Sequence, residues 1–501
     1  MTQPRISPAP RRLDGILTVA LALLILALYL STLCPTVFWY DSAEYATAAA
    51  TLGIPHPPGY PLYTLVGRLF VYLPLEPAYA VNLMSAVFGA AAVALAFAVL
   101  RETGAGPWAA AVGASGLGAS HLFWSQAIIA EVYTPGLCFV LLVLLLLLRG
   151  TRQGRSGAMI AAAGVAGLGL GVHLFLATMG LGYALLVLAF GLPAQRPGDL
   201  RFILSRRELR RRLHVAAGGL TAAMLGSCIY LYLPLRASMH PALNFGDPST
   251  WQRFSWVVTG GNYKGWWLRD YDRLARALRI AGIFYDQLLL VGIVLAAAGL
   301  LFLFRRRAVL ALAYLLMLAG NIAFFFNYRV HDVEVFFLPS VVVLFLLLGL
   351  GAQALLDALS RMLPSGHGPS LLRVAQVVCC AYPLSLALAN HGALDLRGYT
   401  GARDYGEKLS RELPRGAVIA NFTTPPEWKN DAVFADYFQK VLHRRPDVRV
   451  EIAPSPRTML GLVQKGVPLY LYYPDPRVTA LFEVKQEGVA YRVVRPRGGL
   501  R

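Results

Sequence analysis

Charged residues are scarce in this chain. Asp, Glu, Lys and Arg together make up 15% of its 501 residues, whereas hydrophobic residues make up 56%. Soluble domains carry about 25% charged residues, so this composition excludes a soluble protein and predicts a chain that crosses a membrane several times. The net charge of +19 comes mainly from arginines that lie between hydrophobic runs, where they fix orientation in the membrane. We therefore expect contact with the lipid bilayer and no nucleic-acid partner.

Several motifs that would indicate other kinds of protein are also lacking. The sequence has no P-loop, no glycine fingerprint for a dinucleotide and no internal repeat of the kind found in many transporters. Its few cysteines lie in or beside hydrophobic runs without metal-type spacing, so we expect neither a disulfide framework nor a zinc site. The first hydrophobic run lacks a small-residue cleavage site, which favours an uncleaved first span. The cysteines are Cys34, Cys138, Cys228, Cys379 and Cys380.

Long hydrophobic runs dominate the first 390 residues. A run of about 17 to 25 apolar residues can cross the bilayer as a helix. Residues 158–190 are too long for one ordinary span, and their glycines together with His173 near the middle predict a turn between two short helices. The other predicted spans are 15–33, 81–100, 107–122, 133–148, 214–234, 281–304, 308–326, 335–359 and 371–390.

The distribution of arginine decides between one helix and two at residues 158–190. With two helices the chain has about eleven spans, and the arginine-rich connections lie on the same side as the N-terminus. The positive-inside rule makes that side cytoplasmic. With one helix, the arginine-rich loop at 196–212 would face outside, so we favour two.

The chain changes character after residue 390. Residues 391–501 have ordinary polarity, and their patterns predict helices at 402–413 and 432–444. We expect a transmembrane catalytic domain at 1–390 and a small α/β domain outside the membrane at 391–501. Short strands are predicted at 417–422, 448–452 and 467–473.

The stretch most able to carry chemistry follows the first span, at residues 39–70. Asp41 and Glu44 stand three residues apart, so they share one face if residues 42–52 form a helix, as the alanine content suggests. Residues 54–61 read IPHPPGYP, and prolines at this density cannot continue a helix. His56 is therefore held on a stiff loop near the acids. The alternative is structural: Asp41 would cap the helix and Glu44 would complete a capping box.

A series of motifs in this chain resembles a known family. They read DSAEY, LGIPHPPGYPLYTLVGRLF, FWSQAIIAEVYT, YLPLRASMHPALNFGDPSTW, TGGNYKGWW and NYRVHDVEVFFLPS. In this order they resemble the outer loops of bacterial multi-pass proteins related to the animal IPT-domain protein O-mannosyltransferase, which are glycosyltransferases of the GT-C class. The resemblance implies a polytopic all-α membrane protein of GT-C type in the bacterial inner (plasma) membrane, with the C-terminal domain in the periplasm. All these motifs fall in connections that the charge pattern places outside.

The resemblance also implies a catalytic carboxylate in the first outer loop. Asp41 occupies the matching position and is the first choice for the base, with Glu44 as the second; the division of roles between these two acids stays open. His56 and Tyr60 belong to the same loop and are expected to contact substrate. Glu131 lies in a short outer loop and can bind sugar hydroxyls, a second cation or a metal, or serve as a structural partner.

Cations at the outer span ends are candidates for binding a phosphate. Arginine grips two phosphate oxygens through its fork, whereas lysine acts as a point charge. Each of these residues could instead be an interfacial anchor whose charge reaches the membrane surface. Asp247 is a further candidate contact, with helix capping near Ser249 as its alternative role. The phosphate candidates are Arg236, Lys264, Arg329 and His331.

These features favour an inverting glycosyltransferase on the outer face of the membrane. It would move a sugar, with mannose as the first expectation, from a polyprenyl-phosphate donor to a hydroxyl of a protein or glycan acceptor. We expect no cofactor and no metal site, although a divalent metal stays open. The alternatives are a transporter or flippase for lipid-linked sugar, and a non-catalytic scaffold. The candidate acids and cations lie at span ends and not mid-span, which favours the transferase.

Overall fold

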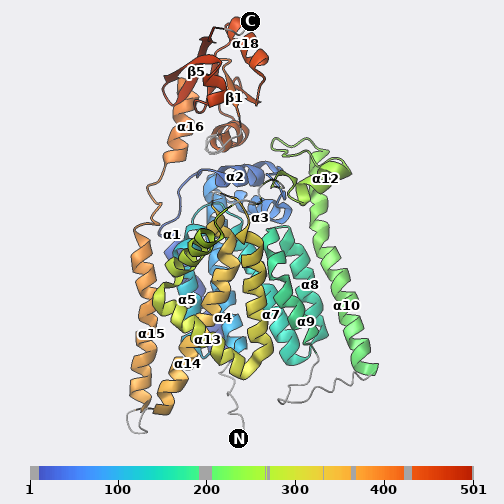
Figure 1. Cartoon of the computed structure of the whole chain (residues 1–501), viewed down its shortest axis with the longest axis vertical. Coiled ribbons are helices and arrows are strands. Elements are labelled where there is room, and N and C mark those ends of the chain that lie inside the picture. The colour runs from blue at the N-terminus through green and yellow to red at the C-terminus, as the bar shows by residue number, and fades with distance from the viewer. Residues whose placement is uncertain are drawn as a thin grey trace.

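The computed structural model describes residues 11–190, 206–263, 265, 267, 271–330, 332–362, 368–422 and 431–498. A helical bundle forms most of the molecule, and a small sheet domain lies at one end of it (Figure 1). The short helices α2 (Asp41–Thr51) and α3 (Pro61–Val71) lie at the end of the bundle nearest that domain. The principal bundle helices are α1 (Arg11–Leu30), α4 (Pro77–Thr103), α5 (Pro107–Ala119), α7 (Tyr133–Gln153), α8 (Ser156–Leu170), α9 (Gly180–Leu188), α10 (Arg206–Ser227), α13 (Arg273–Phe326), α14 (Leu338–Met362) and α15 (Gly368–His391).

Seven of the described helices are long and apolar enough to cross a membrane. One of them, α13, has 54 residues and is interrupted at Leu289 and at Arg307, where the backbone leaves the helical region. The break at Arg307 separates the predicted spans 281–304 and 308–326. Three further apolar helices, α5, α8 and α9, have fewer residues than the roughly 20 that a straight span needs. The membrane character is therefore confirmed, and the count of eleven stays a prediction.

The predicted division of residues 158–190 is confirmed. Helix α8 ends at Leu170, a short 3-10 turn follows at η1 (Leu174–Met179), and α9 begins directly after it. The glycines of α8 serve close packing: a Cβ at Gly167 would lie 2.2 Å from the carbonyl oxygen of Ala223 in α10. Small residues at such contacts let helices approach closely in a membrane, where van der Waals packing holds helices together.

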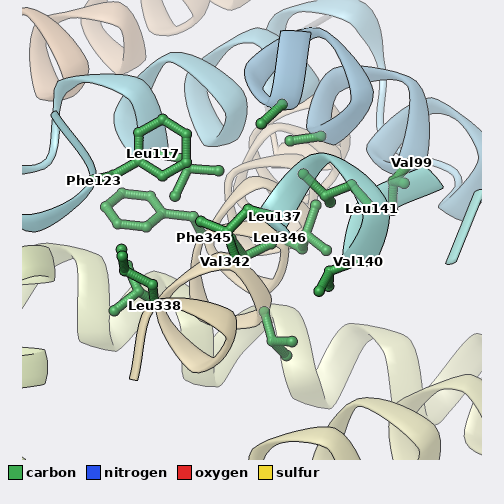
Figure 2. Packing of buried hydrophobic residues seen from close by; sticks show 14 of the residues in the cluster. Val99, Leu117, Phe123, Leu137, Val140, Leu141, Leu338, Val342, Phe345 and Leu346 are labelled. Atoms are coloured by element: carbon green, nitrogen blue, oxygen red, sulfur yellow. The ribbon is translucent and has the colours of Figure 1, made fainter. Parts of the chain in front are cut away.

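Helix α14 is the centre of the bundle. In the most apolar stretch of α14, 89% of the residues are buried. The corresponding fraction is 11% for each of α10 and α15, which lie at the periphery. Figure 2 shows Val342, Phe345 and Leu346 of α14 packed among Leu117, Leu137 and Leu141 of α5 and α7. The exposed apolar faces of the peripheral helices are suited to contact with lipid.

The C-terminal α/β prediction is confirmed. Helix α16 (Gly401–Glu412), helix η5 (Ala432–Val441), and strands β1 (Val418–Asn421), β2 (Arg449–Ile452) and β3 (Leu469–Leu471) fall where the sequence predicted them. Strands β1, β2 and β3 are parallel, and an unpredicted antiparallel hairpin completes a five-stranded sheet in the order β2-β1-β3-β5-β4. The additional elements are α18 (Pro456–Gln464), α19 (Pro476–Thr479), β4 (Phe482–Glu487) and β5 (Ala490–Pro496).

Candidate active site

Helix α2 (Asp41–Thr51) carries both candidate acids, as predicted, but the capping alternative is wrong. Tyr40 occupies the N-cap position and the helix has no side-chain cap bond, so Asp41 is the first helical residue. Glu44 does not reach back to the helix start. Its carboxylate accepts hydrogen bonds from His56 instead. Both carboxylates are therefore available for a role other than helix capping.

His56 lies between the two acids. Its backbone N–H donates to Oε1 of Glu44 at 2.8 Å, and its Nδ1 lies 2.5 Å from Oε2 of the same carboxylate. The opposite ring nitrogen, Nε2, faces Oδ2 of Asp41 at 3.9 Å. The Asp41 side chain remains 46% exposed, whereas that of His56 is only 12% exposed. Asp41 is thus the member of the group that a substrate can reach.

Burial and neighbouring charges determine the protonation states of His56 and Asp41. Burial lowers the pKa of His56, but the negative charges of Glu44 and Asp41 outweigh it and raise the pKa to about 9. The surrounding protein raises the pKa of Asp41 to about 6; His56 opposes the shift, and the charges of Glu44 and Asp332 add to it. At neutral pH the imidazole is therefore protonated and Asp41 is an ionised carboxylate of increased basicity.

Two tyrosines surround the imidazole. Tyr60 is the N-cap residue of α3 (Pro61–Val71), and its hydroxyl lies 3.2 Å from Nε2 of His56. The hydroxyl of Tyr45, from α2, lies 3.4 Å from the same nitrogen. Both tyrosines are buried. Tyr60 thus lies where the sequence placed it, beside the acids, whereas Tyr45 was not predicted as a site residue.

Glu131 comes from the segment between α6 (His121–Ser125) and α7, and it is buried. The hydroxyl of Ser42 donates to its Oε1 at 3.5 Å, which ties it to α2. Burial raises the pKa of Glu131 well above its usual range, and the charges of Asp41 and Asp332 raise it further. The protein therefore favours the protonated form of this acid, which can donate a hydrogen bond.

The structure adds a fourth acid, Asp332, that the sequence did not predict as a site residue. The charge of Asp332 acts on Asp41, His56 and Glu131 together. From its place in the sequence, Asp332 could be expected only to orient His331 or to pair with Arg329. Its approach to Asp41, almost 300 positions earlier in the chain, depends on the packing of the bundle.

The long outer loop also reaches the acids. The N–H of Ile54 donates to the carbonyl of Leu243 at 2.7 Å, and the N–H of Phe245 donates back to the carbonyl of Ile54 at 2.9 Å. Further along this loop, burial raises the pKa of Tyr263 and the charge of Asp41 contributes. The structure therefore brings together parts of the outer motifs that are far apart in sequence.

Arg236 and Asp247 have structural partners. Arg236 donates from Nε to the carbonyl of Leu52 at 2.8 Å and from Nη2 to that of Thr51 at 3.3 Å, so it covers the C-terminal end of α2. Asp247 forms an ion pair with Arg253. The suggestion that Asp247 caps the next helix is wrong, because Thr250 caps α12 (Trp251–Val258).

The remaining phosphate candidates are less defined. Arg329 is exposed, and the described part of the chain records no hydrogen bond or ion pair for its guanidinium. Lys264 and His331 lie outside the described residues. Among the phosphate candidates that the structure describes, Arg329 is therefore the one whose charge is most available to a ligand.

The described residues include one group that could hold a metal ion, formed by Asp41, Glu44 and His56, whose ligand atoms lie within 4.8 Å of one another. Glu44 and His56 already bond each other, so the group is complete without a cation. If a cation bound, the gap between Asp41 and Nε2 of His56 would receive it, with Glu44 fixing the ring from behind.

With the geometry established, comparison of whole structures defines the class of fold. The structure is similar to crystal structures of ArnT from Cupriavidus metallidurans, one of them bound to undecaprenyl phosphate, with a TM-score of 0.62 over 97% of this chain and 98% of that chain at 15% identity. It is also similar to the oligosaccharyltransferase of Archaeoglobus fulgidus, with a TM-score of 0.52 over 92% of this chain and 69% of that one at 12% identity. The chain has a GT-C fold.

Sequence comparison is more specific. The family described as the Protein O-mannosyl-transferase TMEM260 N-terminal domain matches residues 41–194. The mouse Protein O-mannosyl-transferase TMEM260 is 28% identical over 76% of this chain, and the chain covers 55% of the mouse protein. The Dictyostelium discoideum relative of the same name is 28% identical over 24% of this chain and 15% of its own length. The resemblance inferred from the outer motifs is confirmed.

Proposed function

We propose that this protein is an inverting glycosyltransferase that uses a polyprenyl-phosphate sugar, with mannose as the sugar, and a hydroxyl of a protein or glycan as acceptor. One observation carries the proposal: a half-exposed carboxylate of increased basicity, Asp41, lies beside a protonated histidine where the outer motifs converge. The relatives named as O-mannosyltransferases support the choice of sugar. The undecaprenyl phosphate in an ArnT of the same fold supports the choice of donor.

In the proposed reaction, Asp41 removes the proton of the acceptor hydroxyl. The oxygen attacks the anomeric carbon of the donor, the new C–O bond forms, and the bond to phosphate breaks as polyprenyl phosphate leaves with the electron pair. A single displacement inverts the configuration at that carbon. The charge of His56 keeps Asp41 ionised, and Glu44 holds the imidazole in place.

Purified protein in liposomes tests the proposal. We expect polyprenyl-phosphate mannose to be consumed, with release of polyprenyl phosphate and modification of a hydroxyl-bearing peptide or glycan. A flippase would move the donor across the bilayer without consuming it, and a scaffold would do neither. Unconsumed donor in the presence of both kinds of acceptor would contradict the transferase.

The orientation of the protein can be tested by cysteine labelling. In a variant with its native cysteines replaced, a cysteine at Gln153, at the end of α7, should react only from the cytoplasmic side. A cysteine at Ser455, before α18, should react only from the periplasmic side. Both positions are exposed in the structure. Labelling of both from one side would contradict the proposed orientation, in which the C-terminal domain is periplasmic.

Two arginines should respond differently to removal. Arg329→Ala should weaken use of the donor, because a charged hydrogen bond contributes about 1.5 to 3 kcal/mol. Arg236→Ala should mainly lower thermal stability, because it leaves two carbonyls of α2 without their donor. The measurements are the KM for donor and the melting temperature of each variant. An unchanged KM in Arg329→Ala would return this residue to the role of interfacial anchor.

Removal of divalent metal ions tests whether the group of Asp41, Glu44 and His56 works without a cation or as a metal site. Because Glu44 and His56 already satisfy each other, we expect transfer to continue after treatment with EDTA. The control is readdition of Mg²⁺ or Mn²⁺ to treated protein. Loss of transfer that the ion restores would place a cation between Asp41 and His56 and would change the role of Asp41 from base to ligand.

A further inference from the structure

The C-terminal domain packs directly on the segment that carries Asp41. One hydrophobic cluster combines Val37, Ala43 and Ala46, from the first outer loop and α2, with Leu409 of α16 and Phe438 of η5. Figure 1 shows the domain stacked over the α2 end of the bundle. The first outer loop and the C-terminal domain therefore share one core, although more than 350 residues separate them in sequence.

Polar contacts join the two parts at the same place. The hydroxyl of Tyr437, in η5, accepts the N–H of Ala78 at the start of α4 at 3.1 Å. Burial raises the pKa of Asp436 to about 6; its partner Lys440 opposes the shift, and the charge of Glu44 adds to it. The electrostatic field of the candidate active site thus extends into the C-terminal domain.

The shorter of these hydrogen bonds is made by Trp39, two residues before Asp41. The indole Nε1–H donates to the hydroxyl of Tyr399 at 2.5 Å. The indole ring also lies 5.6 Å from the ring of Tyr405, and the neighbouring Phe38 lies 5.2 Å from that of Tyr399. Tyr399 lies two residues before α16, and Tyr405 belongs to this helix. Two residues of the C-terminal domain therefore contact the backbone segment that leads into α2.

The residue between Trp39 and Asp41 has a strained backbone. Tyr40 has φ 57° and ψ −136°, a conformation that favours glycine and is unfavourable for a residue with a side chain. Such conformations persist where the surrounding structure enforces them, and they occur preferentially at functional sites. Here the contacts of Trp39 fix the backbone before Tyr40, and helix α2 fixes the backbone after it. The direction in which Asp41 enters the helix depends on both.

We infer that Trp39, held by Tyr399 and Tyr405, is a positioning residue for Asp41, so that the C-terminal domain is a required part of the transfer machinery. The inference rests on the proposed role of Asp41 as the base. Without this contact the strain at Tyr40 can relax, and Asp41 moves relative to His56 and the acceptor. The protein would keep its fold and its donor site but lose rate.

Trp39→Phe tests the inference because it keeps one aromatic ring in the shared core and removes the indole N–H donor together with the second ring. We expect kcat to fall about tenfold while the KM for donor is unchanged, because small displacements of a reacting group reduce rate without weakening binding. Tyr399→Phe should reproduce the effect, and the double variant should lose little more than either single one. The matched control is Trp108→Phe, at the start of α5 on the opposite side of the bundle. A normal kcat for Trp39→Phe, in protein with the parent's melting temperature, would overturn the inference.

A second measurement is independent of transfer. In protein with its native cysteines replaced, the thiol of Asp41→Cys reports its surroundings through its pKa, read from the rate of alkylation against pH. Adding Trp39→Phe should shift that pKa by about half a unit, because the distance to the charge of His56 changes. Equal pKa values would overturn the positioning role whatever the substrate. Absence of transfer by the parent protein, combined with a shifted thiol pKa, would contradict the proposed function and leave the contact supported.

Discussion

Asp41→Asn should reduce transfer about a hundred- to ten-thousand-fold, because loss of a general base has effects of that size. The substitution removes the charge and keeps the shape of the side chain. Asp41 forms no capping bond at the start of α2, so folding should change little. Donor binding should also survive, since the phosphate candidates lie elsewhere. The measurement is kcat in purified variant protein whose melting temperature matches that of the parent.

A matched control exists on the same side of the bundle. Asp272 is the N-cap residue of α13, and its side chain accepts from two backbone N–H groups. Asn caps a helix about as well as Asp, so Asp272→Asn removes one acidic charge with little structural effect. This variant should keep normal transfer. Near-normal turnover in Asp41→Asn would move the search for the base to Glu44 or Glu131.

The second large effect is expected in the pH dependence of kcat. The base must be ionised, so transfer should rise as pH increases through about 6, the pKa of Asp41. Above about 9, the pKa of His56, the imidazole loses the positive charge that attracts the Asp41 carboxylate and helps to hold it in place, so transfer should fall to a lower level. The profile is therefore expected to be bell-shaped, with a plateau between these values.

Three substitutions should move the limbs of this profile in different directions. His56→Gln removes a positive charge that lowers the pKa of Asp41, so the acid limb should move to higher pH. Asp332→Asn removes a negative charge that raises it, so the same limb should move to lower pH. Glu44→Gln removes the largest contribution that raises the pKa of His56, so the basic limb should move to lower pH. A nearby charge shifts a pKa by about 1 to 3 units. If His56→Gln and Asp332→Asn shifted the acid limb in the same direction, Asp41 would not be the group that titrates.

Local features of the sequence predicted much of this structure. Apolar length, proline density and alanine content gave the positions of the main helices, of α2 and of the stiff loop with His56. The hairpin of β4 and β5 was not predicted, although Gly488 and Val489 stand between two alternating stretches, a pattern typical of a hairpin turn. The arginines at 305–307 predicted a division between two spans, and α13 is interrupted at Arg307.

The parts that escaped prediction depend on contacts between distant segments. Asp332 reaches Asp41 only through the packing of the bundle, and the contact between Trp39 and Tyr399 joins positions 360 residues apart. No periodicity or spacing in a single sequence carries such information. The capping interpretation of Asp41 and Glu44 was reasonable from local spacing. It was wrong because His56, twelve residues beyond Glu44, takes the carboxylate that a capping box requires.

The most direct test of the central claim compares donor consumption by the parent protein and by Asp41→Asn in the same liposomes. Polyprenyl-phosphate mannose is supplied with a hydroxyl-bearing acceptor, and released polyprenyl phosphate is measured over time. The account predicts steady release by the parent protein and by Asp272→Asn, and a rate at least about a hundredfold lower for Asp41→Asn. Equal rates of release by the parent and Asp41→Asn proteins would contradict it.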